Sequence, residues 1–297
     1  MPFAHAQGAR IYYEVTGDGP PILFLHEFGG DWRSWHEQVR HLSRNWRCIT
    51  LSNRGYPRSD APADEAQYGQ DIAIDDALSV LDEVGIARAH VVGLSMGGYT
   101  TLRIALAHPG RVIAAVAAGA GSGSAVAGTG DFIKEAHASA AAMDASAKID
   151  ANAMGHNPTR IQLKVKDPLG WRQFVDNLAE HAGHAAAKTL RQVQARRPSL
   201  YDFRDQMAAS RVPVLLIVGD EDEPCLDVNL WMKRQMPASE LAVLPATGHA
   251  VNLEEPARFN ALVERFLSSV DRGTWRPRDP RASGAGVLTS LGGTRPT

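Results

Sequence analysis

The sequence predicts an α/β protein with a mostly parallel central sheet that is flanked by helices. Short apolar runs alternate with helix-like stretches, as they do in chains built from β–α units. Several of these runs are apolar on nearly every residue, which is typical of strands covered by helices on both faces. The chain has 297 residues, 44% of them hydrophobic and 22% charged, so it can hold one large α/β domain or a core domain with an insertion.

Seven strands are expected along the chain. The turn residues TGDGPP between the first two would allow that pair to form an antiparallel hairpin. The expected strands cover residues 9–15, 21–26, 47–52, 89–95, 111–119, 212–219 and 240–245.

Helices are expected between the strands, because apolar residues recur there at three- and four-residue spacing. One helix is expected over 31–45. A second, over 71–85, ends at Gly85, and a third, over 256–270, begins at Pro256, a residue favoured in the first turn. The residues expected on the inward faces are Trp35, Val39, Leu42, Ala73, Ala77, Leu81, Val84, Phe259, Leu262, Val263 and Phe266.

The strand–helix alternation breaks between about 122 and 210. This segment contains a flexible connector, GSGSAVAGTG, followed by two helix-like stretches at 136–153 and 171–194. We therefore expect a core domain formed by residues 1–121 and 211–270, with residues 122–210 as a helical insertion over the sheet. Residues 271–297 are rich in Gly, Pro and Arg and are expected to form a loosely ordered tail; the alternative is a docking arm.

Composition and charge limit the kinds of partner that the protein is expected to bind. The formal net charge is −2, which gives no reason to expect nucleic acid or an anionic membrane as a partner. The two cysteines, Cys48 and Cys225, are far apart and form no CxxC motif. Neither a disulfide framework nor a thiolate zinc site is therefore expected, and we expect a cytoplasmic location. No signal-peptide pattern is seen at the N-terminus, and no apolar window reaches the roughly 20 residues of a membrane span.

The strongest chemical signal is GLSMGG (93–98), a GxSxG motif between an apolar run and a helical pattern. Such a turn would hold Ser95 in a strained conformation with Oγ above the sheet, while glycines at 93 and 97 relieve backbone crowding. The following helix directs its N-terminus, including the N–H of Met96, at the same point. The alternative is an ordinary glycine-rich turn, because GxSxG matches also occur by chance.

A serine hydroxyl needs a base to act as a nucleophile at neutral pH. Of the eleven histidines, His249 fits best, because PATGHAVNLEEP places it just after the last expected strand. His249 and the acid-rich GDEDEP (219–224) each follow the C-terminal end of a strand, where the sites of open α/β sheets lie. His26 and His90 lie in or beside strands and are expected to pack or to orient loops. The alternative for His249 is a surface loop histidine.

These segments resemble the α/β-hydrolase superfamily over roughly residues 9–270. The resemblance rests on GLSMGG, GDEDEP, GHAVNLEEP, and on FLHEFGGDWRSW and NRGYPRSD after two earlier strands. It implies the α/β-hydrolase fold, a Ser–acid–His triad, an oxyanion hole and a helical cap at 122–210. It also implies that the backbone N–H of Phe28 joins that of Met96 in the oxyanion hole.

The chain departs from the family pattern at two positions. Relatives usually begin the loop with His-Gly, whereas this chain has His26-Glu27. Because the expected donor is a backbone group, this change does not remove the oxyanion hole. The Glu27 carboxylate is expected to point away into a polar contact, and the alternative is a role in proton transfer. Asn53 stands where relatives often carry Asp before Arg-Gly, and we interpret it as a loop-structure position.

The resemblance also selects among the four acids of GDEDEP. In relatives the triad acid commonly stands three residues after the strand-ending glycine, which here is Asp222. Some lactonase-like relatives use a Glu directly before the proline, and Glu223 therefore remains the alternative. Asp220 lies too close to the strand end, and Glu221 is expected to face solvent. The triad acid would accept the Nδ1–H of His249 and fix its tautomer.

No metal ion or organic cofactor is expected. HEQVRH (36–41) resembles a zinc-protease motif, but its histidines are five residues apart and would diverge by about 140° around a helix. His181 and His184 have no evident third ligand. GAGSGS (119–124) lacks the last glycine of the dinucleotide-binding motif.

Together the motifs predict a serine hydrolase that cleaves a carboxylic ester or lactone of a small, fairly apolar molecule through an acyl-enzyme on Ser95. The alternatives are a C–C bond hydrolase of ring-fission products, a cofactor-free perhydrolase, and a ligand-binding receptor with little turnover. Ala250 weighs against the C–C hydrolases, in which a Trp is expected after the histidine. Trp171, Phe174 and Met143 are candidates for an apolar pocket or for helix core. A homo-oligomer is compatible with the sequence.

Overall fold

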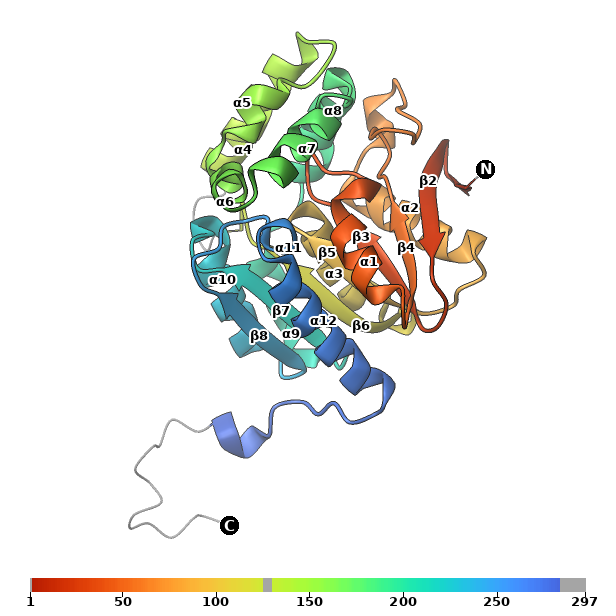
Figure 1. The fold of residues 1–297 in the computed structure, drawn as a ribbon, viewed down its shortest axis with the longest axis vertical. Helices are drawn as coiled ribbons and strands as arrows, with labels where there is room; N and C mark the ends of the chain where they lie inside the picture. The colour runs from red at the N-terminus through yellow and green to blue at the C-terminus, as the bar shows by residue number, and fades with distance from the viewer. Residues whose placement is uncertain (1, 125–129, 284–297) are drawn as a thin grey trace.

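The computed structural model describes residues 2–124 and 130–283. Its centre is an eight-stranded sheet with the order β1-β2-β4-β3-β5-β6-β7-β8 (Figure 1). β2 is antiparallel to β1 and β4, and every other neighbouring pair is parallel, which confirms the expected α/β fold. The strands are β1 (Phe3–Ala6), β2 (Ala9–Thr16), β3 (Pro21–Leu25), β4 (Arg47–Leu51), β5 (Ala89–Leu94), β6 (Val112–Ala118), β7 (Val214–Gly219) and β8 (Ser239–Leu244).

The prediction of a hairpin between the first two expected strands is wrong. β2 pairs with β4, for instance Tyr13 with Leu51, and β3 lies between β4 and β5. The TGDGPP segment therefore connects β2 to β3, which lies on the far side of β4 in the sheet. Gly17 and Gly19 take positive φ angles of 81° and 115° in this connection. β1 was not expected from the sequence, because its four residues are too few to show alternation.

Helices cover both faces of the sheet. α2, α3 and α10 pack on one face, through residues such as Leu81, Leu102 and Met232. α1 and α12 pack on the other face, through Leu42 and Phe259. The helices of these layers and their neighbours are α1 (His36–Leu42), α2 (Gln70–Glu83), α3 (Met96–Ala107), α9 (Arg204–Ala209), α10 (Glu223–Gln235), α11 (Val251–Glu254) and α12 (Pro256–Asp271). Short 3₁₀ turns lie at Trp32–Trp35, Glu65–Gln67, Pro109–Arg111, Leu200–Phe203 and Pro280–Ser283.

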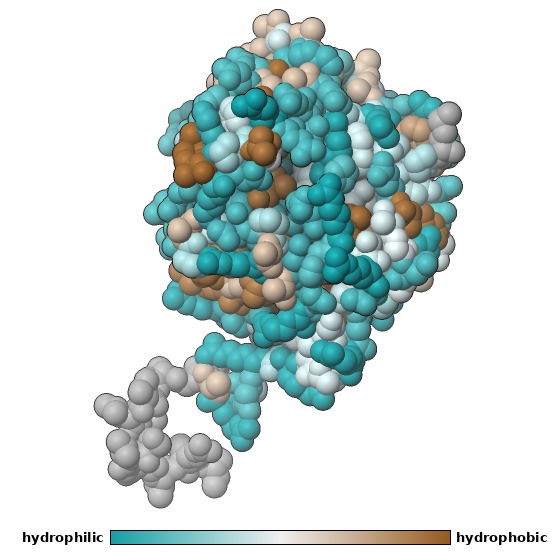
Figure 2. All heavy atoms as spheres, in the orientation of Figure 1, coloured by the Kyte–Doolittle hydropathy of each residue, from teal (hydrophilic) through white to brown (hydrophobic). Residues whose placement is uncertain are grey.

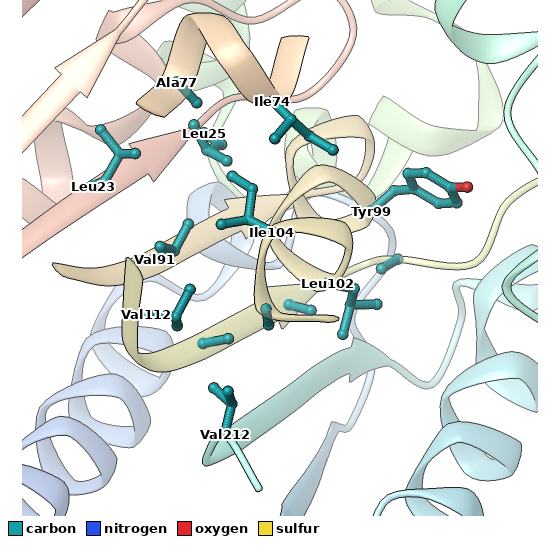
Figure 3. Packing of buried hydrophobic residues seen from close by; sticks show 14 of the residues in the cluster. Leu23, Leu25, Ile74, Ala77, Val91, Tyr99, Leu102, Ile104, Val112 and Val212 are labelled. Carbon is teal, nitrogen blue, oxygen red and sulfur yellow. The ribbon is translucent and has the colours of Figure 1, made fainter. Parts of the chain in front are cut away.

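Strand β3 separates the two hydrophobic clusters. Leu23 and Leu25 join the cluster under α2 and α3, whereas Ile22 and Phe24 join the cluster under α1 and α12. Successive side chains of a strand point to opposite faces of the sheet, so an all-apolar strand is expected between two helix layers. Figure 3 shows the first cluster, in which Leu23 and Leu25 lie near side chains of α2 and α3.

The inward face of α2 differs in part from the expected one. Ala73 and Val84 are only partly buried, as are Val39 and Leu262 in the other helices. α2 packs against β1, β2 and α3 at once, which buries a broader face than the predicted stripe. The buried apolar residues of α2 are Ile74, Ala77, Leu78, Val80 and Leu81.

Of the six α-helices that the structure describes between β6 and β7, all but α9 gather at one end of the sheet (Figure 1). They pack on one another through a cluster of their own, formed by Ile149, Ala151, Leu163, Phe174, Leu178 and Ala186. The helices are α4 (Gly130–Asp144), α5 (Ala151–Gly155), α6 (Pro158–Lys166), α7 (Pro168–Leu178) and α8 (Gly183–Thr189), followed by a π-helical turn (Leu190–Gln194).

Neither helix-like stretch of this insertion is one continuous helix. Within 136–153, α4 ends at Asp144, and Asp150 caps the start of α5 by accepting a hydrogen bond from Ala153 N–H (2.9 Å). Within 171–194, the chain breaks between Leu178 and Gly183 before α8 begins. High alanine content gives helix propensity but does not mark such breaks.

The face drawn in Figure 2 is mostly hydrophilic, with separate apolar groups. Three exposed large apolar side chains of the described residues, Ile161, Val165 and Leu169, lie on α6 and α7. Within the two described ranges, every helix is too short or too polar to span a bilayer.

Two residues in the first part of the predicted tail, 271–297, contact the core. Trp275 donates its Nε1–H to a carboxylate oxygen of Glu240 (2.9 Å) and meets the ring of Phe266 edge-on. The backbone N–H of Arg278 donates to the Pro237 carbonyl (3.3 Å). The end of the predicted tail, 284–297, is outside the described residues.

A buried ion pair fixes the loop after β4. Arg54 donates to both carboxylate oxygens of Asp76 in α2 (2.6 and 2.8 Å), and the two side chains are 5% and 1% exposed. Replacing Arg54 by Ala should lower the free energy of unfolding by about 3–5 kcal/mol, because the Asp76 carboxylate would stay buried without its partner. Urea denaturation measures this change. Arg10→Ala, which removes the exposed pair with Asp60, should leave the urea midpoint nearly unchanged; equal losses in the two variants would contradict the argument.

Candidate active site

Ser95 lies at the turn between β5 and α3 and has φ 54° and ψ −112°. A non-glycine residue with positive φ is strained, and here the turn places the serine at the N-terminus of α3. The flanking glycines make the turn possible, because a Cβ on Gly93 would overlap the Gly97 carbonyl. A Cβ on Gly97 would overlap the Leu25 carbonyl of β3. The motif therefore has the strand–turn–helix context that the sequence predicts.

The structure brings His249 and Asp222 together with Ser95. Ser95 Oγ lies 2.8 Å from His249 Nε2, and His249 Nδ1 lies 2.8 Å from Asp222 Oδ2. A carboxylate can only accept, so the histidine carries its proton on Nδ1 and its Nε2 accepts from the serine hydroxyl. His249 and Asp222 are 6% and 3% exposed, which keeps water from competing for these hydrogen bonds.

The other three acids of GDEDEP have different surroundings. Glu223, the alternative to Asp222, is exposed at the first residue of α10. Asp220 accepts the backbone N–H of Thr247 (3.1 Å) and so ties the loop after β7 to the loop after β8. Glu221 is exposed, as expected, and accepts a hydrogen bond from the Gln162 amide of α6. Only Asp222 of the four therefore reaches His249.

Phe28 and Met96 come from different elements but meet beside Ser95. Phe28 follows β3, and Met96 is the first residue of α3. The two residues belong to one apolar cluster with Tyr56 and Val193. The backbone groups proposed as oxyanion donors therefore belong to two segments that pack together next to the serine.

His26 fixes the loop that contains Phe28. Its Nδ1–H donates to the Glu27 carbonyl (2.7 Å), and its Nε2 accepts the backbone N–H of Asn53 (3.0 Å). Burial lowers the pKa of His26 to about 4, so the ring is neutral at pH 7 and keeps the acceptor that Asn53 needs. His26 and Asn53 are thus loop-orienting residues, as expected, and His90 packs with its Nε2 on the Asp271 carboxylate (2.8 Å).

Glu27 is fully buried and lies near a cation. Its Oε1 is 3.7 Å from a guanidinium nitrogen of Arg160, which is itself only 3% exposed. Arg160 comes from α6, and its guanidinium also stacks over the ring of Phe174 at 4.7 Å. Burial raises the pKa of the Glu27 carboxyl, and the charge of Arg160 opposes that rise. Glu27 Oε1 also accepts a hydrogen bond from Ser34 Oγ (3.4 Å), so the carboxylate lies between the loop and α6 and not toward solvent.

Glu254 holds the backbone on both sides of His249, a role that we did not expect from the sequence. Its carboxylate accepts from the N–H of Gly248 (2.6 Å) and the N–H of Ala250 (3.0 Å), and the residue is 6% exposed. Ala250 is the N-cap of α11, and Glu254 is the last residue of this short helix. The acid stands four residues after the cap, not three as in a capping box, so no standard motif marks this contact.

One group of described residues, Asp222, Cys225 and His249, has three possible metal-ligating atoms within 4.8 Å of one another. Two of the three residues are hydrogen-bonded to each other as described. The Cys225 thiol donates to the Gly119 carbonyl (3.3 Å) and also contacts Ser122 Oγ. The possible ligand atoms of these three residues therefore all have hydrogen-bond partners within the protein.

A groove of about 400 Å³ opens between α1 and helices α6 and α7. Phe174, Leu163 and Leu253 contribute apolar surface to it, but most of its lining residues are polar or charged, and neither Ser95 nor His249 lines it. Of the other pocket candidates, Trp171 donates its Nε1–H to the Gly155 carbonyl (2.7 Å) and so packs α7 on α5. Met143 packs beside Phe174 and Phe28, as part of the apolar cluster of the insertion.

The close fit at Gly97 gives a testable result. Gly97→Ala should lower the free energy of unfolding by about 1–3 kcal/mol, because the new methyl group must displace the β3 backbone. Urea denaturation measures this change. Gly110→Ala is the matched control, since nothing lies within 4 Å of its Cβ position. Equal free energies of unfolding in the two variants would show that the turn can accommodate a methyl group at position 97.

Comparison with known proteins identifies the family of this chain. Residues 20–256 match the family described as alpha/beta hydrolase fold. The chain is 28% identical over 270 residues to 3-oxoadipate enol-lactonase 1 of Acinetobacter baylyi, which covers 89% of this chain and 95% of that protein. It is 29% identical over 292 residues to 2-hydroxymuconate semialdehyde hydrolase of a Pseudomonas species, with coverage of 90% and 93%.

A solved structure agrees with this family at the level of the fold. The crystal structure of the enol-lactonase from Burkholderia xenovorans matches with a TM-score of 0.77 at 24% identity, over 90% of this chain and 100% of that chain. The family match covers most of the chain, from before β3 to the start of α12. The chain therefore belongs to the α/β hydrolase fold family.

Proposed function

We propose that this protein is a serine hydrolase that cleaves a carboxylic ester or lactone of a small, fairly apolar molecule. The observation that carries the proposal is the relay from Ser95 through His249 to Asp222, with 2.8 Å at each step. The relay gives the serine hydroxyl a base and gives the base a fixed tautomer, which are the two requirements for nucleophilic attack by serine.

In the proposed reaction, Ser95 Oγ attacks the carbonyl carbon while His249 Nε2 takes its proton. The Asp222 carboxylate stabilises the imidazolium that forms, and the N–H groups of Met96 and Phe28 stabilise the oxyanion. His249 then donates the proton to the leaving alkoxide, which departs as the alcohol and leaves an acyl group on Ser95. Water attacks this acyl group as His249 removes its proton, and the carboxylic acid is released.

The apolar cluster beside Ser95 supports the proposed substrate class. Phe28, Met96 and Val193 belong to this cluster, and such a lining suits an uncharged acyl or alcohol portion. The buried cysteines, Cys48 and Cys225, fit the proposed cytoplasmic location.

Labelling with a fluorophosphonate, together with turnover of p-nitrophenyl acetate and butyrate, tests the proposal. We expect one label per chain on Ser95 and hydrolysis of at least one of the two esters. A protein that takes up no label and hydrolyses neither ester would instead be a ligand-binding receptor.

A second assay separates the kinds of bond. The panel contains lactones and ring-fission dienes, because the relatives include an enol-lactonase and a semialdehyde hydrolase. We expect esters or lactones to be cleaved faster than the dienes, since Ala250 follows the histidine in place of a Trp. Faster cleavage of the dienes would identify a C–C bond hydrolase.

A further inference from the structure

Helix α6 lies directly against the loops that contain Asp222 and His249. The Gln162 amide donates to the carboxylate of Glu221, one residue before Asp222. Lys166 Nζ donates to Thr247 Oγ1 (3.3 Å), two residues before His249, and α6 as a whole packs against α11. The seating of this one helix is therefore coupled to the loops after β7 and β8.

Arg160 extends the contacts of α6 to a third loop. Its guanidinium reaches Glu27, the neighbour of Phe28, at 3.7 Å, and its own hydrogen bonds go to the adjacent Thr159 (3.1 and 3.4 Å). Among the described residues, Arg160 Nε and Glu27 Oε2 have no hydrogen-bond partner. A buried guanidinium and a buried carboxylate with atoms left unpaired hold each other by charge more than by hydrogen bonds.

A second buried carboxylate lies on the helix against which α6 packs. Glu254, which holds the backbone on both sides of His249, belongs to this helix, α11. Burial lowers the pKa of the Arg160 guanidinium, and the charge of Glu27 is the largest influence that raises it. Burial raises the pKa of Glu254, and the hydrogen bonds from the Gly248 and Ala250 N–H groups are the largest influences that oppose the rise. The cation of the insertion thus lies against one buried carboxylate of the core, Glu27.

We propose that Arg160 is a positioning residue, whose guanidinium is the counter-charge of Glu27 beside the oxyanion donors and holds α6 against the loops of Asp222 and His249. The catalytic groups are then correctly placed only while α6 is seated on the core. This inference rests on the proposed serine-hydrolase function. It assigns Arg160 to the enzyme's own carboxylate and not to an anionic group of the substrate.

A charge-removal cycle tests the proposal with p-nitrophenyl acetate, which is uncharged. Arg160→Gln should lower kcat on the order of 100-fold, because the Glu27 loop loses its counter-charge and α6 shifts on the catalytic loops. KM should change by less than about threefold, since no substrate contact is removed. Adding Glu27→Gln to Arg160→Gln should recover at least about tenfold of the lost kcat, because one unpaired buried carboxylate is then gone.

Other outcomes would overturn the proposal. A double variant no more active than Arg160→Gln would show that Arg160 does not act as a counter-charge. A raised KM for an ester with a carboxylate on its acyl chain, with normal kinetics for p-nitrophenyl acetate, would make Arg160 a substrate ligand. Arg191→Gln is the matched control, because Arg191 also belongs to the insertion but pairs with Glu65 and Asp144 near the surface; its kcat should be normal.

Arg160→Lys serves if Arg160→Gln does not fold. It keeps the charge and loses the planar guanidinium, so its kcat should fall by less than about tenfold. A lysine variant that folds but has lost all activity would contradict a role based on charge.

A readout without turnover separates this inference from the proposed function. The far-downfield proton resonance of His249 Nδ1–H reports its hydrogen bond to Asp222. We expect the resonance to shift or broaden in Arg160→Gln and to return in the double variant with Glu27→Gln. A wild-type protein that shows the resonance but hydrolyses no substrate would contradict the proposed function and leave the positioning role of Arg160 intact. An unchanged resonance in Arg160→Gln would contradict the positioning role of Arg160.

Discussion

Ser95→Ala is expected to lower kcat for p-nitrophenyl esters by about 10⁶-fold, the loss found when the nucleophile of a serine triad is removed. The reason is structural: Ser95 Oγ is the atom within hydrogen-bond distance of His249 Nε2, and its backbone is held in a strained turn at the start of α3. The variant keeps the fold and the neighbouring donors, so its residual activity measures what those donors contribute alone.

Two measurements make this result decisive. The variant should take up no fluorophosphonate, while its urea midpoint stays at or slightly above that of the wild type. Ser122→Ala is a useful control, because Ser122 follows β6 nearby and contacts Cys225 but not His249. Ester hydrolysis that survives in Ser95→Ala, after correction for the uncatalysed rate, would place the nucleophile elsewhere.

Asp222→Asn is expected to lower kcat by about 10⁴-fold, because an amide can donate to His249 Nδ1 and favour the wrong tautomer. Glu223→Gln should change kcat by no more than about twofold, since substitutions at such exposed positions typically alter free energies by less than about 0.5 kcal/mol. Steady-state kinetics with the same ester measure both variants. The two residues are adjacent in sequence, so they form a matched pair.

The reverse result would reassign the acid. A large loss in Glu223→Gln with a nearly normal Asp222→Asn would mean that the start of α10 rearranges during the reaction. The distance of 2.8 Å between His249 Nδ1 and Asp222 Oδ2 makes Asp222 the expected acid. The fold and the role of Ser95 would be unaffected by such a reassignment.

Much of the fold and the placement of the candidate site could be predicted from the sequence. Ser95 and His249 each follow a strand that the apolar runs identify, and parallel strands end at one edge of the sheet. The strand order was less accessible: the turn residues of TGDGPP are typical of a hairpin, but β2 pairs with β4 instead. Pairing between distant strands leaves no signal in the local pattern of a single sequence.

The contacts around the site were also beyond local patterns. Glu254 is one of two consecutive acids in GHAVNLEEP, and no standard motif distinguishes it. Arg160 carries no motif at all. Its approach to Glu27 depends on how α6 packs on the core, across more than a hundred residues of chain. Local propensity does not specify packing of that kind.

The small hydrophobic cluster of α5 to α8 has a consequence for how this protein can change. That cluster is separate from the two clusters that stabilise the sheet. Substitutions within it can therefore change how α5 to α8 pack without loosening the layers that hold Ser95. Sequence change in the insertion is then restricted mainly by the few polar residues of α6 that contact the core, Arg160, Gln162 and Lys166.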